Sequence, residues 1–298
     1  MGVASASTDE PRSEARSLPI TFSIVGVQKG ATSTLYGMLG SHRRIARGPA
    51  KERHFFDDES RTWDPPDYSD YHTPTTKPRI RIAGDATPIY LFWPNALERM
   101  HAYNPEMLLI ASFRDPIERA FSQWSMERGR KVPLPDFGAA IEDERFNAVP
   151  EAMPSGQGVR RGGLRTRTLV GRGLYGQQLR RGFELFGDRA QWLLLDFREF
   201  LGEPKATLDR VTDFLGIERY RSYPELQKRN ASPDNHTGVP PTGDDIARLA
   251  EFYADDLAEF TELSSLDTSS WATRRILAGD LDPAELAEKL SRRAGLIG

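Results

Sequence analysis

The chain has 298 residues with 40 basic and 43 acidic side chains, which give a formal net charge of −3, and 38% of its residues are hydrophobic. These values are typical of a globular protein and argue against a disordered chain or a general nucleic-acid binder. No apolar stretch reaches the roughly 18 residues that a membrane-spanning helix needs, and the lack of cysteine excludes disulfides, thiolate metal sites and a cysteine nucleophile.

Residues 1–18 are predicted to be a flexible leader, because they are small, polar or charged and offer little surface to bury. They contain no apolar segment of the kind found in secretory signals, so we expect a cytoplasmic protein. We expect residues 19–271 to form one domain and residues 272–298 to form a C-terminal helical extension. The segments 60–78 and 129–166 are interpreted as long loops over one core.

Apolar runs with the periods of strands and of helices alternate along the chain. The predicted strands cover residues 20–27, 79–84, 107–113 and 191–197. The predicted helices cover residues 32–39, 117–128, 208–215 and 246–260, and a short terminal helix begins at Asp282. This alternation predicts an α/β domain with a central, mostly parallel sheet flanked by helices. Ligands of such sheets bind at the carboxyl ends of strands, so the loops after the first and third strands are candidate sites.

A glycine-containing turn follows the first predicted strand. Its backbone N–H groups lie at the N-terminus of the next helix, where the helix dipole favours an anion. The candidate anion-binding residues are Lys29, Gly30, Ala31, Thr32, Ser33 and Thr34. The Walker A pattern is not met, because Lys29 precedes Gly30 and Ala31 stands where that motif needs its second glycine. An ordinary strand–turn–helix connection is the alternative interpretation.

Arg114 stands at the carboxyl end of the third predicted strand, and Ser122 lies one to two turns into the helix that follows. A guanidinium and a hydroxyl at this place can hold a second phosphate, the guanidinium through two parallel hydrogen bonds. The alternative is a surface pair of Arg114 with Asp115 and a serine on a helix face.

Four ordered motifs resemble those of the sulfotransferases that use 3′-phosphoadenosine 5′-phosphosulfate (PAPS) as donor. The resemblance is to the heparan sulfate 3-O-sulfotransferase branch and its bacterial relatives in particular. The patterns G-V-x-K-G-G-T, E-x-H-F-F-D, T-P-x-Y and R-D-P-x-E-R-x-x-S correspond to residues 26–32, 52–57, 87–90 and 114–122. The similarity covers about residue 20 to Trp271. It implies a P-loop-like three-layer fold and the transfer of a sulfuryl group from PAPS to a hydroxyl, with no metal required.

The resemblance also implies roles for individual residues. Lys29 and the loop after the first strand would hold the 5′-phosphosulfate, while Arg114 and Ser122 would hold the 3′-phosphate. Tyr175 matches a tyrosine that lies near the nucleotide in the family. Lys228 and Arg229 correspond to a late basic loop that closes over the 3′-phosphate.

Residues 51–57 place several ionisable groups beside two phenylalanines. Attack by an alcohol needs a base, and a carboxylate desolvated by Phe55 and Phe56 would have a raised pKa suited to that role. The resemblance makes Glu52 this base, with His54 as the second candidate. Lys29 would then neutralise charge on the leaving group. The alternative is that the segment has no catalytic role, with its two phenylalanines packed in the core and its charged groups exposed to solvent.

Two features leave the acceptor open. Ala86 stands where related enzymes carry a lysine, so either Asp85 takes another role toward the acceptor or a basic residue from elsewhere replaces the lysine. The acceptor is therefore a small molecule, a glycolipid or a saccharide, and a heparan-like polymer is in doubt. Between residues 152 and 183 there are seven arginines and no acidic residue, which indicates a solvated face or an electropositive funnel.

The 40 basic residues are 33 arginines and 7 lysines, a skew that hints at a bacterial genome of high GC content. Two other functions stay open at this point. A nucleotide-dependent kinase would prefer ATP with Mg²⁺, and a non-catalytic polyanion-binding module would bind heparin-like polymers without transferring sulfate.

Overall fold

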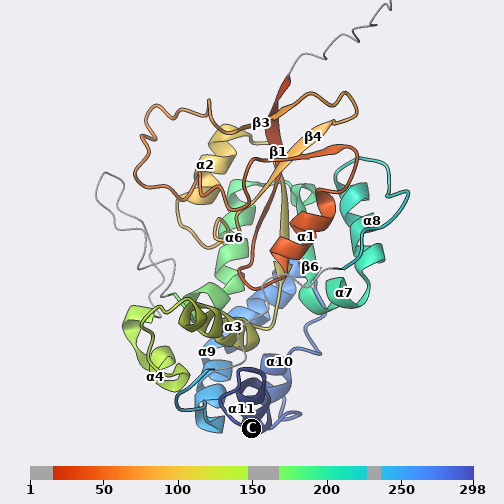
Figure 1. Cartoon of the computed structure of the whole chain (residues 1–298). Coiled ribbons are helices and arrows are strands. Elements are labelled where there is room, and N and C mark those ends of the chain that lie inside the picture. The colour runs from red at the N-terminus through yellow and green to blue at the C-terminus, as the bar shows by residue number, and fades with distance from the viewer. Residues whose placement is uncertain (1–15, 147–167, 227–235) are drawn as a thin grey trace, which may run out of the picture.

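The strands of the central sheet are parallel, except for one short strand that pairs antiparallel with the start of the first strand. The computed structural model describes residues 16–146, 168–226 and 236–298. Within them the strand order is β2-β4-β1-β5-β6, all parallel, and β3 pairs antiparallel with the start of β1 (Figure 1). The strands are β1 Arg16–Gly26, β2 Ile45–Arg47, β3 His72–Thr75, β4 Ile82–Ala86, β5 Leu108–Phe113 and β6 Trp192–Asp196.

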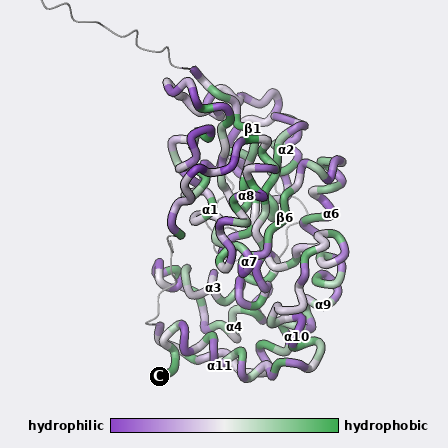
Figure 2. The backbone as a smooth tube through the Cα atoms, turned by 90° about the vertical axis from the view of Figure 1, so that its right-hand side faces the viewer, coloured by the Kyte–Doolittle hydropathy of each residue, from purple (hydrophilic) through white to green (hydrophobic). Residues whose placement is uncertain are grey.

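Helices cover both faces of this sheet. One face packs against α1 (Thr32–Leu39), α7 (Phe197–Gly202) and α8 (Pro204–Phe214), and the other packs against α2 (Ala96–Tyr103), α6 (Tyr175–Leu185) and α9 (Gly243–Ser264). Alternation along β5 explains the two contacts, because Leu109, Ala111 and Phe113 face the second group while Ile110 faces the first. Hydrophobic stretches follow the central strands in Figure 2. The predicted α/β class with a flanked, mostly parallel sheet is confirmed.

A second core lies beyond the sheet and includes the end of the chain. It joins α9 to α3 (Pro116–Gly129), α4 (Phe137–Glu142), α10 (Ala272–Leu277) and α11 (Pro283–Arg293). Trp124 of α3 and Leu290 of α11 belong to the same buried cluster. The residues after 271 are therefore packed against the rest of the chain.

The predicted elements are present, most of them with shifted ends. The elements β2, β3, α2, α4, α6, α7 and α10 were not predicted as separate elements, and α4 lies in the segment 129–166 that was interpreted as a loop. The helix predicted over 32–39 has those bounds, whereas β4 lies three residues later at its start than the predicted strand 79–84. Residues 16–18, predicted as part of the leader, lie in β1, because they pair with β3. The segment 60–78, interpreted as a loop, contains β3. In the described part of the chain, no helix has both the length and the apolar character needed to cross a bilayer.

Candidate functional site

The loop between β1 and α1 holds two side-chain-bearing residues in the left-handed region. The backbone φ is 73° at Lys29 and 60° at Ala31, and strain of this kind persists mainly at functional sites. The loop opens into a cavity of about 520 Å³, which we call the loop cavity. Its lining includes five residues of the predicted anion site, Lys29, Ala31, Thr32, Ser33 and Thr34.

Gly30 lies behind these residues and allows the loop to pass close to the sheet. Its N–H donates to the Val27 carbonyl at 3.0 Å. A Cβ at this position would lie 2.1 Å from the carbonyl oxygen of Ser112, a backbone atom of β5 that cannot move aside. The predicted glycine therefore contributes through its lack of a side chain.

The substitution Gly30→Ala is expected to lower the free energy of unfolding by about 3 kcal/mol, because the added methyl group forces the loop away from β5. Chemical denaturation measures this loss. Gly187→Ala is the matched control, since a Cβ at Gly187 would meet no atom within 4 Å. Equal stability of the two variants would contradict this account of the loop.

Lys29 and Arg114 line the same cavity although they follow different strands. Burial lowers the pKa of Lys29 to about 8, and the nearby positive charges of Arg114 and Arg130 add to this effect. The two predicted phosphate-binding groups therefore line one cavity, and their positive charges repel each other. An anion between them would relieve the repulsion.

Arg114 is held in place from several sides. Its side chain is mostly buried, and its Nη2 lies 3.3 Å from Oε2 of Glu118, one turn along α3. The guanidinium carbon lies 4.9 Å from the ring centre of Phe197. Asp115 caps α3 by accepting a hydrogen bond from the N–H of Glu118 at 2.9 Å. Ser122, on the same helix, also lines the loop cavity.

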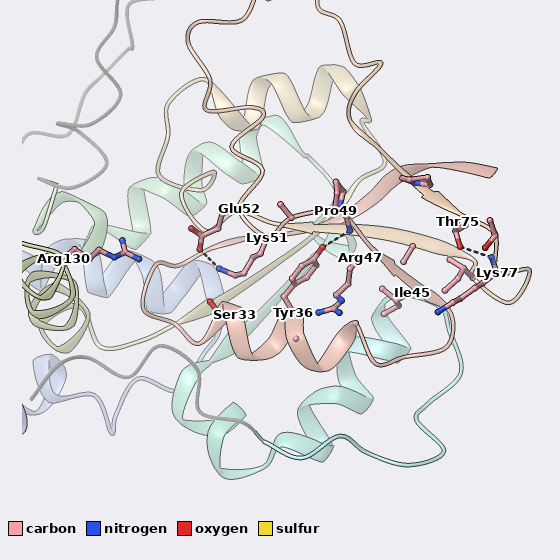
Figure 3. A pocket seen from close by; sticks show the side chains of 18 residues that line it. Ser33, Tyr36, Ile45, Arg47, Pro49, Lys51, Glu52, Thr75, Lys77 and Arg130 are labelled. Atoms are coloured by element: carbon pink, nitrogen blue, oxygen red, sulfur yellow. Dashed lines mark hydrogen bonds and ion pairs between the residues drawn. The ribbon is translucent and has the colours of Figure 1, made fainter. Parts of the chain in front are cut away.

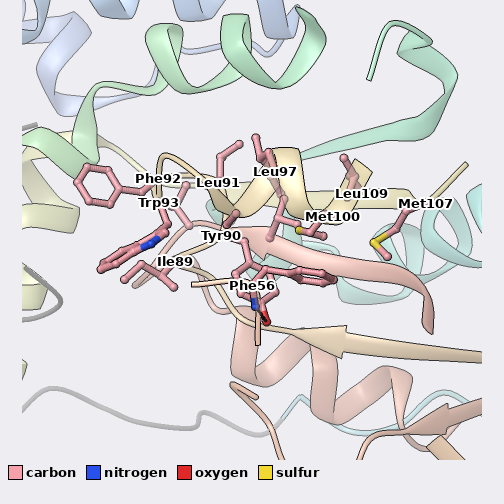
Figure 4. Close-up of a cluster of buried hydrophobic side chains, with 14 of the residues drawn as sticks. Phe56, Ile89, Tyr90, Leu91, Phe92, Trp93, Leu97, Met100, Met107 and Leu109 are labelled. Carbon is pink, nitrogen blue, oxygen red and sulfur yellow. Dashed lines mark hydrogen bonds between the residues drawn. The ribbon is translucent and has the colours of Figure 1, made fainter. Parts of the chain in front are cut away.

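The segment 52–57 is anchored by the aromatic core. The hydroxyl of Tyr90 accepts a hydrogen bond from the N–H of Phe55 at 2.9 Å. The N–H of Glu52 donates to the Ala86 carbonyl at 3.0 Å. Phe56 and Tyr90 pack together in the cluster shown in Figure 4. Two of the sequence motifs, 52–57 and 87–90, are therefore one structural unit.

Glu52, His54 and Asp57 form a chain of ionisable groups. The Nδ1 atom of His54 lies 2.9 Å from Oδ2 of the fully buried Asp57, and its Nε2 lies 3.9 Å from Oε2 of Glu52. A proton on Nδ1 that bonds to Asp57 leaves Nε2 directed toward Glu52. Glu52 and His54 both have positive φ, 58° and 51°. The structure thus brings the two candidate bases together.

The expectation that Phe55 and Phe56 desolvate Glu52 is wrong. Both rings are buried in the aromatic cluster with Tyr71, away from solvent. The Glu52 side chain is 46% exposed and pairs with the ammonium group of Lys51. Its surroundings are therefore polar, with a cation and an imidazole in place of the predicted apolar contacts.

A second cavity, which we call the basic groove, extends from Glu52 along α1. It has a volume of about 1120 Å³ and runs between Arg130 and Glu52 at one end and Thr75 and Lys77 at the other (Figure 3). Four cations line it, Arg47, Lys51, Lys77 and Arg130, and Glu52 is the one carboxylate among its described lining residues. Ser33, Glu52 and Arg130 line both the groove and the loop cavity. Glu52 thus lies where the two cavities meet.

Known proteins are similar to this chain in sequence and in structure. No family model matches the chain. It is 26% identical over 266 residues to human heparan sulfate glucosamine 3-O-sulfotransferase 3B1, covering 82% of this chain and 63% of the relative. It is 29% identical over 199 residues to mouse heparan sulfate glucosamine 3-O-sulfotransferase 6, and the match covers 66% of this chain and 52% of the relative. The crystal structure of a sulfotransferase from Alicyclobacillus acidocaldarius superposes with a TM-score of 0.62 at 25% identity, covering 85% of this chain and 98% of that one.

The chain is a relative of the sulfotransferases. The predicted resemblance and the predicted P-loop-like fold are both confirmed by these similarities. The chain spans between half and two thirds of the length of the curated relatives named above.

One predicted nucleotide contact of this sulfotransferase relative, Tyr175, does not line the loop cavity. Tyr175 is 1% exposed, and its hydroxyl donates to the carbonyl of Arg114 at 2.8 Å. It therefore supports Arg114 from behind and does not line the cavity. Lys228 and Arg229 lie outside the described residues.

Asp85 does not face the acceptor side of the site, so the first explanation for the missing lysine at Ala86 is wrong. Its carboxylate is fully buried and accepts hydrogen bonds from Tyr71 at 3.2 Å and Thr87 at 3.0 Å. Burial raises its pKa. Lys51 fits the second explanation, because its ammonium pairs with Glu52, whose backbone is bonded to Ala86.

The arginine-rich run is structural where it is described. Arg172 donates to the side chains of Thr168 and Gln28, and Arg181 donates to the carbonyl of Leu91. Arg180 pairs with Glu259 on α9. Arg160, Arg161, Arg165 and Arg167 lie outside the described residues. None of the three described arginines lines the loop cavity or the basic groove.

Sequence reasoning missed three site residues. Asp57 was part of a recognised motif, and its spacing of three from His54 was the available signal. Arg130 follows the end of α3, and Arg293 lies near the end of the chain, yet both line the loop cavity. No local sequence pattern indicates that these two arginines lie at a cavity formed by the loop after β1.

Proposed function

We propose that this protein transfers a sulfuryl group from PAPS to a hydroxyl group of an acceptor, releasing PAP and an O-sulfated product. The observation that carries the proposal is the position of Glu52, which lines both the loop cavity and the basic groove. A base at that junction can reach an acceptor hydroxyl in the groove next to a donor in the loop cavity. We assign this activity to residues 19–271, with residues 272–298 as an extension.

The loop cavity suits a donor with negative charge at two ends. We assign the phosphosulfate to Lys29, the backbone N–H groups of the loop and the hydroxyls of Thr32, Ser33 and Thr34. We assign the 3′-phosphate to Arg114 and Ser122. The volume of about 520 Å³ lies in the range of small-molecule sites. PAPS, when bound, supplies the sulfuryl group that is transferred.

Glu52 is the proposed general base. It would take the proton of the acceptor hydroxyl as that oxygen bonds to sulfur, and the bond between sulfur and the phosphate oxygen breaks. Lys29 would stabilise the negative charge that develops on the released phosphate. His54, which is oriented by Asp57, lies 3.9 Å from Glu52 and would add a second ionisable group beside the base.

The basic groove supports an acceptor that carries negative charge. Its lining has four cations and a single described carboxylate, and that carboxylate is Glu52 itself. We propose an anionic saccharide, glycolipid or small molecule with a free hydroxyl. Lys51 would replace the lysine that related enzymes carry at the position of Ala86. The kinase and the polyanion-binding alternatives have no support among the relatives.

Ligand discrimination tests the proposal. PAP is expected to raise the melting temperature of the protein more than ADP or ATP with Mg²⁺ at equal concentration, because only PAP offers a 3′-phosphate to Arg114. Transfer of label from [³⁵S]PAPS to a panel of anionic acceptors then measures turnover. A preference for ATP with Mg²⁺ over PAP would contradict the proposal.

Binding of PAP is expected to weaken above about pH 8. The pKa of Lys29 is lowered to about 8 by burial and neighbouring arginines, and a bound phosphate favours its charged form. Below that pH, Lys29 is already protonated. Above it, binding takes up a proton, and the Kd for PAP rises by up to about tenfold per pH unit.

Isothermal titration calorimetry between about pH 7 and 9.5 measures this Kd, and buffers of different ionisation enthalpy measure the proton uptake. In Lys29→Met, the rise of the Kd above pH 8 should disappear. A Kd for the unmodified protein that is constant over this range would show that Lys29 does not contact the ligand.

A further inference from the structure

Helix α11 forms a wall of the loop cavity although it lies at the end of the chain. Leu290, Arg293 and Ala294 line this cavity together with Arg114. In Figure 1, α11 lies beneath α3, the helix that carries Ser122. Leu290 is buried in the core shared with α3, so the helix is fixed against this end of the cavity.

A neighbouring cavity of about 490 Å³ shows how strongly positive this region is. It shares four lining residues with the loop cavity, Arg114, Glu118, Phe197 and Arg293. Five cations line it, Arg114, Arg198, Arg275, Lys289 and Arg293, against two carboxylates, Glu118 and Glu285. Positive charge therefore exceeds negative charge where α11 meets Arg114.

The carboxylate nearest to Arg114 is already engaged. Glu118 pairs with Arg114 at 3.3 Å and with Arg198 at 3.0 Å. Among the described residues, no carboxylate lies within ion-pair distance of Arg293, which is exposed to solvent. Burial lowers the pKa of Arg114, and the charge of Arg293 lowers it further. The two guanidinium groups are thus close neighbours with an unbalanced charge.

We propose that Arg293 binds the 3′-phosphate of the donor together with Arg114, so that the C-terminal helix is part of the donor site. The inference rests on the proposed function. A phosphate between the two guanidinium groups would accept charge-assisted hydrogen bonds from both and remove their repulsion. This assignment gives residues 272–298 a role in binding the ligand, in addition to their packing in the core.

A ligand pair that differs only in the 3′-phosphate tests this assignment. Calorimetric titration of the full chain with PAP and with AMP gives two Kd values for each variant. In Arg293→Ala, the Kd for PAP should rise about tenfold or more, while the Kd for AMP changes less than about twofold. Arg293→Lys keeps the positive charge but lacks the paired N–H donors of the guanidinium group. Its Kd for PAP should lie between those of the unmodified protein and Arg293→Ala.

Arg292→Ala is the matched control, because it removes the same charge one residue earlier. Arg292 pairs with Glu288 at 2.7 Å and does not line the loop cavity, so both Kd values should stay unchanged. If the unmodified protein prefers PAP over AMP and Arg293→Ala keeps that preference, the role of Arg293 is overturned and the proposed function stands. An equal loss for both ligands in Arg293→Ala would also overturn it. If the unmodified protein does not prefer PAP, the proposed function and the inference both fail.

Discussion

Replacing Glu52 by glutamine is expected to lower kcat about a thousandfold while the Kd for PAP changes less than about twofold. Glutamine keeps the shape and the backbone conformation of the segment but cannot accept the proton of the acceptor hydroxyl. Lys51 and the groove remain in place, so the acceptor still binds. Label transfer from PAPS at saturating acceptor measures kcat, and calorimetry measures the Kd.

Glu251→Gln is the control for Glu52→Gln. Glu251 is exposed on α9 and lines none of the three cavities, so its replacement should change neither constant. Near-normal turnover in Glu52→Gln would remove Glu52 as the base. His54→Asn would then be the decisive variant, since His54 is the other base candidate and lies 3.9 Å from Glu52.

The alternation of the central strands β1, β4, β5 and β6 with helices could be predicted because these strands are mostly apolar runs, whereas β2, α2 and α6 were missed. The strand predicted over 107–113 is a continuous apolar run, and β5 starts one residue later and ends at the same residue. The loop after β1 could be located for a similar reason, because Gly30 and Lys29 stand together between a strand and a helix. Patterns of this kind lie within one segment of the sequence, so they do not depend on which distant residues that segment contacts.

Features that depend on distant partners could not be predicted. The start of β1 is fixed by its pairing with β3, and β3 has the sequence His-Thr-Pro-Thr, which has no strand pattern. Phe55 and Phe56 stood beside Glu52 in sequence, but their rings pack with Tyr71 on the inner side of the segment. Arg293 lines the loop cavity because α11 packs against α9 in the second core, a contact between segments far apart in the sequence.

The substitution Lys29→Met is expected to lower kcat/KM for PAPS by two to three orders of magnitude, or about 3–4 kcal/mol of transition-state stabilisation. Methionine has nearly the same length and flexibility but offers no charge to the leaving phosphate. Lys205→Met is the control, because Lys205 is exposed on α8 and lines none of the three cavities described above. Single-turnover label transfer separates the loss in the chemical step from the loss in donor binding.

The same variant should melt at a higher temperature than the unmodified protein in the absence of ligand. The folded-state pKa of Lys29 is about 8 and its ordinary value is 10.5, so folding disfavours the charged form, by roughly 1–3 kcal/mol at neutral pH. This penalty is fully present below pH 8 and disappears as the pH approaches 10.5. The difference in melting temperature between Lys29→Met and the unmodified protein should therefore shrink over that interval. A variant that loses activity and also melts at a lower temperature would indicate that Lys29 stabilises the loop, and that its charge is not held in place for a ligand.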